Sequence, residues 1–363
     1  MRSVRAMRKL LQCLVLAVCS IVSALTPAVT VSELYTVTIR RNPEAQNERT
    51  DAIERAMIEV VTRITGSRVL ARAPELEPLL STAGRYVDAY GSLNANEAFV
   101  RFTPGNIEQA LTSLNLPVWG AERPLTILWI AVTDQFGDSA ILSSGELDLG
   151  VDYGDNMRTI LETMRTDIED VARARGLPYV LPLLDVLDLA SVDFIDIWNF
   201  DLPTLTAASV RYAADSIVVA HVRASEIGSD VEWLMSMGFD QRSLPGASVQ
   251  QGIDWIADIY ATQFASVGGA RPMVLRVTGV ADFESYARVV SYLERLSLLD
   301  RVDIESFDDG ELMLRVQSRA DAEVLARVLS LGGVVRESRG FGGSAAFPGS
   351  MLSLEVVRND PFR

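Results

Sequence analysis

One run of the chain, residues 125–132 (LTILWIAV), is apolar on both faces. A strand buried between two layers has this pattern, because neither of its faces meets water. Residues 48–65 instead carry apolar side chains at helical spacing and end before Gly66, which predicts an amphipathic helix with a glycine stop. Residues 34–40 alternate between apolar and polar types, as a half-buried strand does. The pattern therefore predicts helices packed in layers on β-sheets.

Residues 31–120 form the first predicted unit, a small N-terminal α/β unit. Besides the elements above, its pattern predicts a weaker helix at 74–83, strands at 85–90 and 97–102, and a helix at 106–114. The unit closes at Trp119 and Gly120, and residues 121–123 are expected to form a short polar turn that leads into the buried run.

Residues 121–268 form the second predicted unit, a central α/β domain with a layered sheet built on the run 125–132. Asn156 is a favourable N-cap and Gly176 a favourable stop, so they bound a predicted helix at 156–175. Residues 133–155 are polar and rich in Gly and Asp, which is typical of a long loop or an irregular hairpin. The other expected elements are a strand at 177–184, helices near 192–198 and 205–214, antiparallel strands at 216–222 and 230–237, and a helix at 249–264.

Residues 271–363 form the third predicted unit, which a linker at Gly268-Gly269 precedes. Its expected elements are strands at 273–277, 302–307, 312–316 and 352–357, with helices at 283–296 and 320–331. This β-α-β-β-α-β order is the ferredoxin-like pattern, and the glycine-rich insert 339–350 is expected to be a loop. The fold class is therefore α/β and α+β, in three units.

The first 24 residues have the pattern of a secretory signal peptide. A basic segment (Arg2, Arg5, Arg8 and Lys9) precedes an apolar stretch at 10–22, and Val22-Ser23-Ala24 offers the small residues of a cleavage site. We expect cleavage after Ala24, with Ala28 as the alternative, and a periplasmic protein without a stable transmembrane span. If the peptide is retained, it anchors the chain in the inner membrane, although Thr26-Pro27 would break that helix.

Composition excludes several kinds of chemistry. Both cysteines, Cys13 and Cys19, lie in the predicted signal peptide, so the mature chain has no thiol and no disulfide. Lys9 is the only lysine and His221 the only histidine among 363 residues, which excludes a multi-histidine metal site. The formal net charge of −15 argues against a nucleic-acid partner. No cofactor motif, metal motif or catalytic constellation is present, and the glycine-rich pieces lack the lysine of a phosphate loop.

Three residues remain as candidate ligand-binding groups. Asp185 lies at the carboxyl end of the predicted strand 177–184, where open α/β sheets bind ligands, and Asp188 belongs to the same acidic run. Apolar residues separate these acids, so the alternative interpretation is a pair of amphipathic elements with solvated acidic edges. His221 is the only possible imidazole base, but a strand histidine that makes a structural hydrogen bond is the favoured interpretation. Trp119 and Trp129 are expected to be packing anchors at the unit boundary.

Several short strings give the chain a resemblance to a known family. They are residues 34–37 (LYTV), 63–66 (RITG), 116–120 (LPVWG), 128–132 (LWIAV), 175–178 (RGLP), 181–185 (LPLLD) and 208–212 (ASVRY). Together they resemble an exported proteobacterial family known as domain of unknown function 2066. The resemblance implies export and the domain order given above, and it implies no activity, cofactor or catalytic residue.

Two functional hypotheses follow. The first is a non-enzymatic envelope protein, an adaptor, assembly factor or scaffold that binds other envelope proteins or peptidoglycan. The alternative is a carboxylate-dependent hydrolase of a cell-wall glycan, which needs two carboxyl groups facing each other across a cleft, about 5–10 Å apart. Converging acids in a concave pocket would favour the hydrolase, whereas an exposed apolar patch would favour the binding protein.

Overall fold

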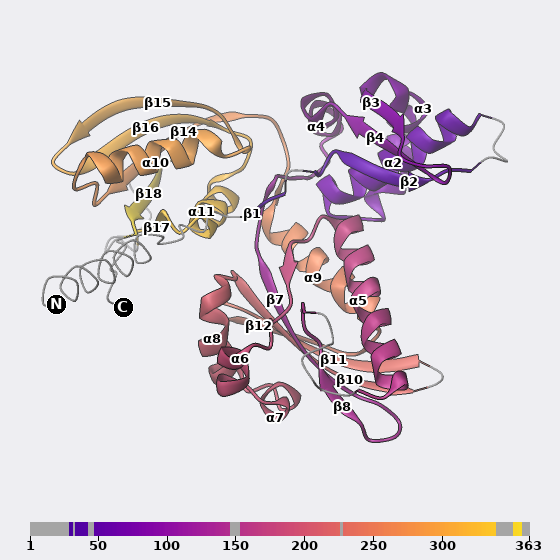
Figure 1. The fold of residues 1–363 in the computed structure, drawn as a ribbon. Helices are drawn as coiled ribbons and strands as arrows, with labels where there is room; N and C mark the ends of the chain where they lie inside the picture. Colours follow the sequence, from indigo (N-terminus) through magenta and orange to yellow (C-terminus); the bar gives the residue numbers. More distant parts are fainter. Residues whose placement is uncertain are drawn as a thin grey trace, which may run out of the picture.

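The computed structural model describes residues 29–31, 33–42, 47–145, 153–225, 228–338 and 351–357. The basic segment, both cysteines, the Ala24 cleavage site and the insert 339–350 lie outside these ranges. Three bodies meet near the middle of the molecule (Figure 1). Within the described ranges, no helix has both the length and the apolar character needed to cross a bilayer.

The first body is a three-stranded antiparallel sheet covered by a long helix. The strands are β2 (Thr36–Arg40), β3 (Val87–Ser92) and β4 (Glu97–Phe102), in the order β2-β4-β3. The helix α2 (Glu48–Thr65) buries its apolar stripe and ends at Gly66 with a left-handed φ of 66°, as its pattern predicts. The single helix expected at 74–83 is instead η2 (Pro74–Leu76), α3 (Glu77–Ser81) and the start of η3 (Ala83–Tyr86), because prolines fit only the first turn of a helix. The shorter elements η1 (Leu70–Arg72) and α4 (Pro104–Ser113) complete the body.

The central body is a six-stranded sheet between two helical layers. Its strands are ordered β12-β11-β10-β7-β8, and β9 also pairs with β7. Their bounds are β7 (Thr126–Thr133), β8 (Ser139–Ile141), β9 (Tyr179–Val180), β10 (Ser216–Ser225), β11 (Gly228–Met237) and β12 (Asp240–Ala247). The helices are α5 (Asp155–Arg175), α6 (Val186–Ser191), α7 (Phe194–Trp198), α8 (Leu202–Ser209), η4 (Val210–Tyr212) and α9 (Val249–Phe264).

Strand β7 is buried on both faces, as its sequence predicts. Leu128, Ile130 and Val132 join the core beneath α5 and α9, whereas Ile127 and Trp129 join the core beneath α6, α7 and α8. β7 therefore holds both helical layers on one sheet.

Two local predictions for this body are wrong. The strand expected at 177–184 is only β9, because Pro182 has no N–H for a ladder and Leu184 takes a left-handed φ of 52°. Asn156 is not the N-cap of α5: Gly154 takes that place, and Asn156 donates a hydrogen bond to Asp134 (2.7 Å). β8 pairs antiparallel with the end of β7, which agrees with the hairpin alternative for 133–155. The edge strand β12 was not predicted, because it is polar and contains proline.

The last body is a five-stranded mixed sheet with two helices. Its elements are β14 (Arg271–Thr278), α10 (Phe283–Arg295), β15 (Leu299–Asp308), β16 (Glu311–Ser318), α11 (Ala322–Leu331), β17 (Val335–Glu337) and β18 (Met351–Val356). The order is β15-β16-β14-β18-β17, in which β18 runs parallel to β14 and the unpredicted β17 lies outside β18. The mixed α/β class of the chain is confirmed, and the ferredoxin-like assignment stays a prediction.

Short strands join the three bodies. β5 (Val118–Trp119) leaves the first body and pairs with β13 (Ala265–Ser266), which leads from the central body into the last. β6 (Glu122–Arg123) pairs with β1 (Val29–Thr30). The short polar turn expected at 121–123 is therefore wrong: Glu122 and Arg123 form a strand and are buried.

Candidate functional site

The most unusual surface of the molecule lies on one helical layer of the central body, formed by α6, α7, α8 and η4. We call these elements the helical layer. The buried Trp129 of β7 holds it from below by donating a hydrogen bond to Ser209 of α8 (2.9 Å) and meeting the ring of Tyr212 edge-on. Ile197 and Leu205 complete the packing on the sheet. The layer is thus an integral part of the fold.

Helix α6 has an inverted polarity. Its aspartate, Asp188, is buried with 1% of its surface exposed, whereas Val186, Leu187 and Leu189 are exposed. A surface helix normally turns its apolar stripe inward and its charges to water. The sequence suggests amphipathic elements with solvated acids, and for Asp188 that expectation is wrong.

Asp188 is buried because three donors hold its carboxylate. Arg211 donates to Oδ1 (3.0 Å), while the Tyr212 hydroxyl and the Leu184 backbone N–H (2.9 Å) donate to Oδ2. Burial, together with the bond to Asp188, raises the pKa of Tyr212 to about 12, so its hydroxyl remains a donor at neutral pH. Satisfied in this way, the carboxylate can stay inside the protein.

Asp185 binds the same arginine. The two Nη atoms of Arg211 each donate to one Asp185 oxygen at 2.7 Å, and Asp185 also caps α6 by accepting from the Leu187 and Asp188 backbone N–H groups. The bond to Arg211 holds the pKa of Asp185 well below its ordinary value. The structure therefore brings two of the three predicted ligand-binding residues together, with their oxygens already engaged by Arg211 and by backbone donors.

His221 lies outside the helical layer, on β10 of the sheet, where it packs against α7. Its ring stacks on Trp198 with centroids 4.6 Å apart and lies 5.0 Å from the ring of Phe200. Nδ1 makes a hydrogen bond with the Trp198 carbonyl (3.0 Å), and Nε2 lies 3.4 Å from a Glu232 carboxylate oxygen. His221 thus fastens α7 to β10 and does not join Asp185 and Asp188. Within the described ranges, no group of three or more potential metal-binding side chains occurs.

Backbone strain is concentrated in the same layer. Leu184 before α6, Phe200 between α7 and α8, and Ala213 after η4 have φ angles of 52°, 57° and 48°. A left-handed conformation costs a non-glycine residue about 1–2 kcal/mol. Such strained positions gather where function constrains the backbone. The helical layer is therefore shaped against local conformational preference at three places.

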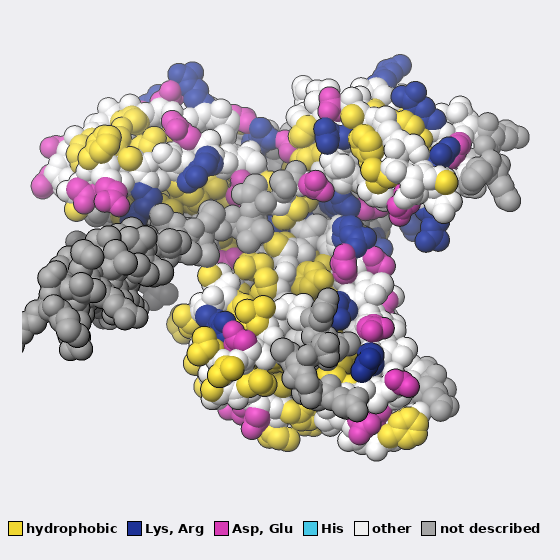
Figure 2. All heavy atoms as spheres, in the orientation of Figure 1, with side chains coloured by type: hydrophobic (Ala, Val, Ile, Leu, Met, Phe, Trp, Pro, Cys, Tyr) yellow, Lys and Arg dark blue, Asp and Glu magenta, His cyan; other side chains and the backbone are white. Residues whose placement is uncertain are grey.

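Apolar side chains gather on the outer surface of this layer (Figure 2). Six residues, each exposing between 48% and 81% of its surface, make up what we call the apolar face: Leu183, Val186, Leu187, Leu189, Ile195 and Val210. Single exposed apolar residues are ordinary, but a contiguous group on adjacent helices marks an interaction site. The apolar face is the candidate functional site.

A second polar constellation joins the bodies, and sequence reasoning missed it. Arg123 is fully buried and donates to the carbonyl oxygens of Arg63 (2.7 Å), Arg175 (2.9 Å), Gly176 (3.0 Å), Gly120 (3.1 Å) and Trp119 (3.3 Å). Several of these carbonyls end α2 and α5, so the negative ends of two helices surround the guanidinium, which also stacks on Trp119 at 3.9 Å. Burial lowers the pKa of Arg123 to about 9.

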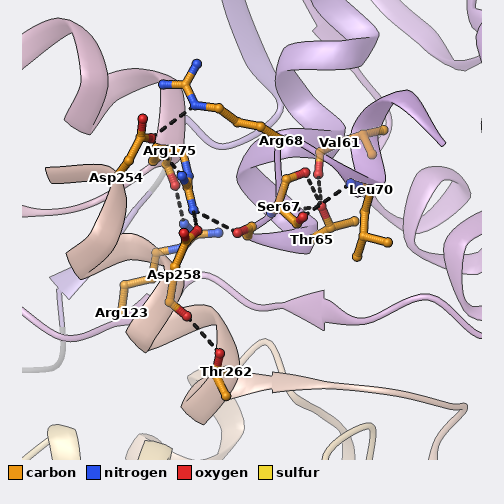
Figure 3. A network of polar contacts seen from close by, with 11 residues as sticks. Val61, Thr65, Ser67, Arg68, Leu70, Arg123, Arg175, Asp254, Asp258 and Thr262 are labelled. Carbon is orange, nitrogen blue, oxygen red and sulfur yellow. Dashed lines mark hydrogen bonds and ion pairs between the residues drawn. The ribbon is translucent and has the colours of Figure 1, made fainter. Parts of the chain in front are cut away.

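Arg175, the last residue of α5, extends this joint to α9 (Figure 3). It donates to Asp254 (2.7 Å), to Asp258 and to the carbonyl of Gly66 at the end of α2 (2.8 Å). At Gly66 a Cβ atom would lie 2.2 Å from the Cβ of Ala261, so glycine is needed for this approach of α2 to α9. The arrangement is a structural joint between the first and central bodies.

The joint explains the position of one predicted anchor. Trp119 is 1% exposed and lies against Arg123, while Trp129 is buried between the sheet and the helical layer. The only sequence signal for the joint was a pair of charges, Glu122 and Arg123, set between two apolar runs. Glu122 accepts hydrogen bonds from the backbone N–H and the hydroxyl of Ser297, which ties the last body to the same place.

A comparison with protein-family models gives one match, to a domain of unknown function (DUF8605), over residues 28–120. The resemblance to domain of unknown function 2066 is therefore wrong: the short strings that suggested it are not specific enough to separate two families. The comparisons with curated proteins and with solved structures give no match. The matched segment corresponds to the first body and ends at Gly120, just before the buried Arg123.

Proposed function

We propose that the chain is a non-enzymatic adaptor or assembly protein that binds a protein partner through its apolar face. The inversion of α6 is the observation that carries this proposal. Burying a Leu or Val side chain completely stabilises a protein by about 1.5–3 kcal/mol. The exposed side chains of the apolar face lack much of this stabilisation, and a bound partner would provide it. Placing Asp188 inward and Leu187 outward fits a helix that is covered in its working state.

The alternative hydrolase receives less support from the same residues. A glycan hydrolase of the carboxylate type needs two acids with access to substrate across a cleft. Asp185 and Asp188 instead converge on Arg211, and Asp188 is buried. The five acids of the stretch 185–201 lie among exposed apolar side chains, which favours a binding surface.

We propose the periplasm as the compartment, on the signal-peptide pattern of residues 1–24. Cell fractionation of the full-length protein, followed by mass spectrometry of its N-terminus, tests this. The expected result is a periplasmic protein whose first residue is Leu25. An intact first methionine in the cytosol would remove the basis for an envelope partner.

Site-specific photocrosslinking in cells tests the docking function. A photoreactive amino acid at Leu187 is expected to crosslink to one discrete protein, and the crosslink is expected to vanish when Leu189 is changed to Asp. The matched control is Phe239, an exposed apolar residue in the turn between β11 and β12. A crosslinking pattern at Leu187 equal to that at Phe239, or crosslinks only to glycan, contradicts the proposal.

A further inference from the structure

We infer that the partner segment that covers the apolar face is amphipathic and cationic, with apolar side chains flanked by Lys or Arg. This inference rests on the proposed docking function and specifies its partner. Charge provides the first argument. Residues 183–212 contain five aspartates and one arginine, a formal charge of −4 in thirty residues that also carry the apolar face. Interfaces place opposite charges against each other, and like charges there are costly.

The distribution of ion pairs strengthens this argument. Arg211 is engaged with Asp185 and Asp188, which leaves three acids of the layer without an ion pair among the described residues. Asp193 and Asp196 form a capping box at the start of α7, and Asp201 accepts from the Thr204 hydroxyl (2.9 Å). These acids keep their charges open to a cationic partner. Asp193 and Asp196 lie on either side of the exposed Ile195 in the first turn of α7, and Asp201 occupies the N-cap position of α8.

A hollow at one edge of the face gives the apolar part of the partner a place to enter. Its volume is about 480 Å³, and its apolar wall consists of Tyr179, Val180, Leu181, Leu183 and Tyr212. The polar side chains Ser144, Arg165 and Glu169 line the rest of it, so this part of the surface carries both signs of charge and suits an apolar side chain of the partner. Leu183 belongs to both the hollow and the apolar face, so the two surfaces are continuous. Interfaces draw most of their energy from a few large side chains inserted into such pockets. A Leu, Phe or Trp side chain of the partner would occupy this hollow.

The same charges argue against a membrane as the occupant. Amphipathic helices that bind anionic bilayers are rich in Lys and Arg on the polar face. The helical layer has the opposite sign, so an anionic lipid surface would repel it. A protein segment with positive flanks satisfies both the apolar surface and the unpaired acids.

Selection from a random peptide library displayed on phage tests the inference. The full-length protein is the target, and a Leu187→Asp/Leu189→Asp variant is used to remove peptides that bind elsewhere. Enriched peptides are expected to combine two or more large apolar residues with Lys or Arg. One enriched peptide is then synthesised, and its affinity is measured by fluorescence anisotropy at low and high salt.

Two charge variants complete the design. The first neutralises the unpaired acids, and asparagine keeps a hydrogen-bond acceptor at each position: Asp193→Asn, Asp196→Asn and Asp201→Asn. The matched control removes the same charge from exposed positions of the last body: Glu284→Gln, Glu294→Gln and Asp308→Asn. At low salt the first variant is expected to bind the peptide about tenfold more weakly, as three modest ion pairs together would give, and the control within about twofold of the wild type.

Each alternative outcome has a definite meaning. Enrichment of acidic or uncharged peptides, no enrichment over the depleting variant, or equal binding by both charge variants overturns the inference. Co-sedimentation with vesicles of phosphatidylglycerol and phosphatidylethanolamine, lost in Leu187→Asp, overturns it in favour of a membrane. If Leu187 crosslinks in cells to a protein segment without positive charge, the docking function stands and only the cationic partner is refuted.

Discussion

Replacing Arg123 by methionine tests the physical account of the joint between the first and central bodies. The change keeps most of the side-chain volume and removes five hydrogen bonds donated to buried carbonyls. At about 1 kcal/mol for each unmade bond, the loss is about 5 kcal/mol. Methionine also removes the desolvation penalty of the buried guanidinium charge, and this offsets part of the loss. We expect the free energy that holds α2 against α5 to fall by about 3 kcal/mol.

Hydrogen exchange measured by mass spectrometry is the appropriate assay, because a chain of several bodies does not unfold in one two-state step. Amides of α2 are expected to exchange about 100-fold faster in Arg123→Met, which corresponds to about 3 kcal/mol. Amides of β14 in the last body serve as an internal reference. Arg123→Lys keeps the charge but cannot reach five carbonyls at once, so an intermediate rate is expected.

Arg68→Ala provides the matched control. Arg68 also bridges the two bodies, through Asp254 at 3.0 Å, but half of its side chain is exposed. An exposed ion pair contributes about 0–1 kcal/mol, so α2 exchange is expected to change little. Two results would refute this account: equal effects of Arg68→Ala and Arg123→Met, or full protection of the α2 amides in Arg123→Met. In either case the hydrogen bonds from Arg123 to the ends of α2 and α5 do not stabilise the joint.

Three further predictions concern the central body. Ala213→Gly relieves a left-handed backbone and is expected to stabilise the protein by about 0.5–1 kcal/mol, which thermal unfolding measures; a lower melting temperature would contradict this. Burial raises the pKa of Asp215 to about 6, above its unfolded value of about 3.9, so stability should fall as pH rises from about 4 to 6 and stay low above it. Asp215→Asn still accepts from the Leu125 N–H and should gain about 1–3 kcal/mol at pH 8 but little at pH 4 in urea unfolding. Leu187→Ser should change stability by less than about 0.5 kcal/mol while reducing the binding of an apolar dye; a large loss of stability would mean that Leu187 supports the fold.

Sequence periodicity located the elements whose apolar stripe and caps agree. The helices expected at 48–65 and 249–264 have those bounds in the structure, because apolar spacing and clear end signals coincide there. The sheet partners at 216–222 and 230–237 are also confirmed as an antiparallel pair. The strand β12 was out of reach, since a polar edge strand that contains Pro245 has no apolar alternation to detect.

The candidate site depended on information that periodicity does not contain. When several aspartates lie among apolar residues, the sequence does not show which aspartate will form an ion pair with a distant arginine. Asp188 is buried because Arg211, more than twenty positions later, returns to it across the turn of the layer. Arg123 is a similar case, since its partners are backbone carbonyls, which every residue has and no sequence pattern marks.

The chain enters the central body after β5 and leaves it through β13. Because these two strands pair with each other, the two connections between bodies depend on each other. Trp119 lies opposite Ala265 and Val118 opposite Ser266, so the way into the central sheet and the way out of it form one small ladder. A truncation after residue 264 would remove one side of that ladder and uncover Trp119, although no residue of the first body had been touched. Fragments of this chain that are expressed separately should therefore keep both β5 and β13, because each strand stabilises the position of the other.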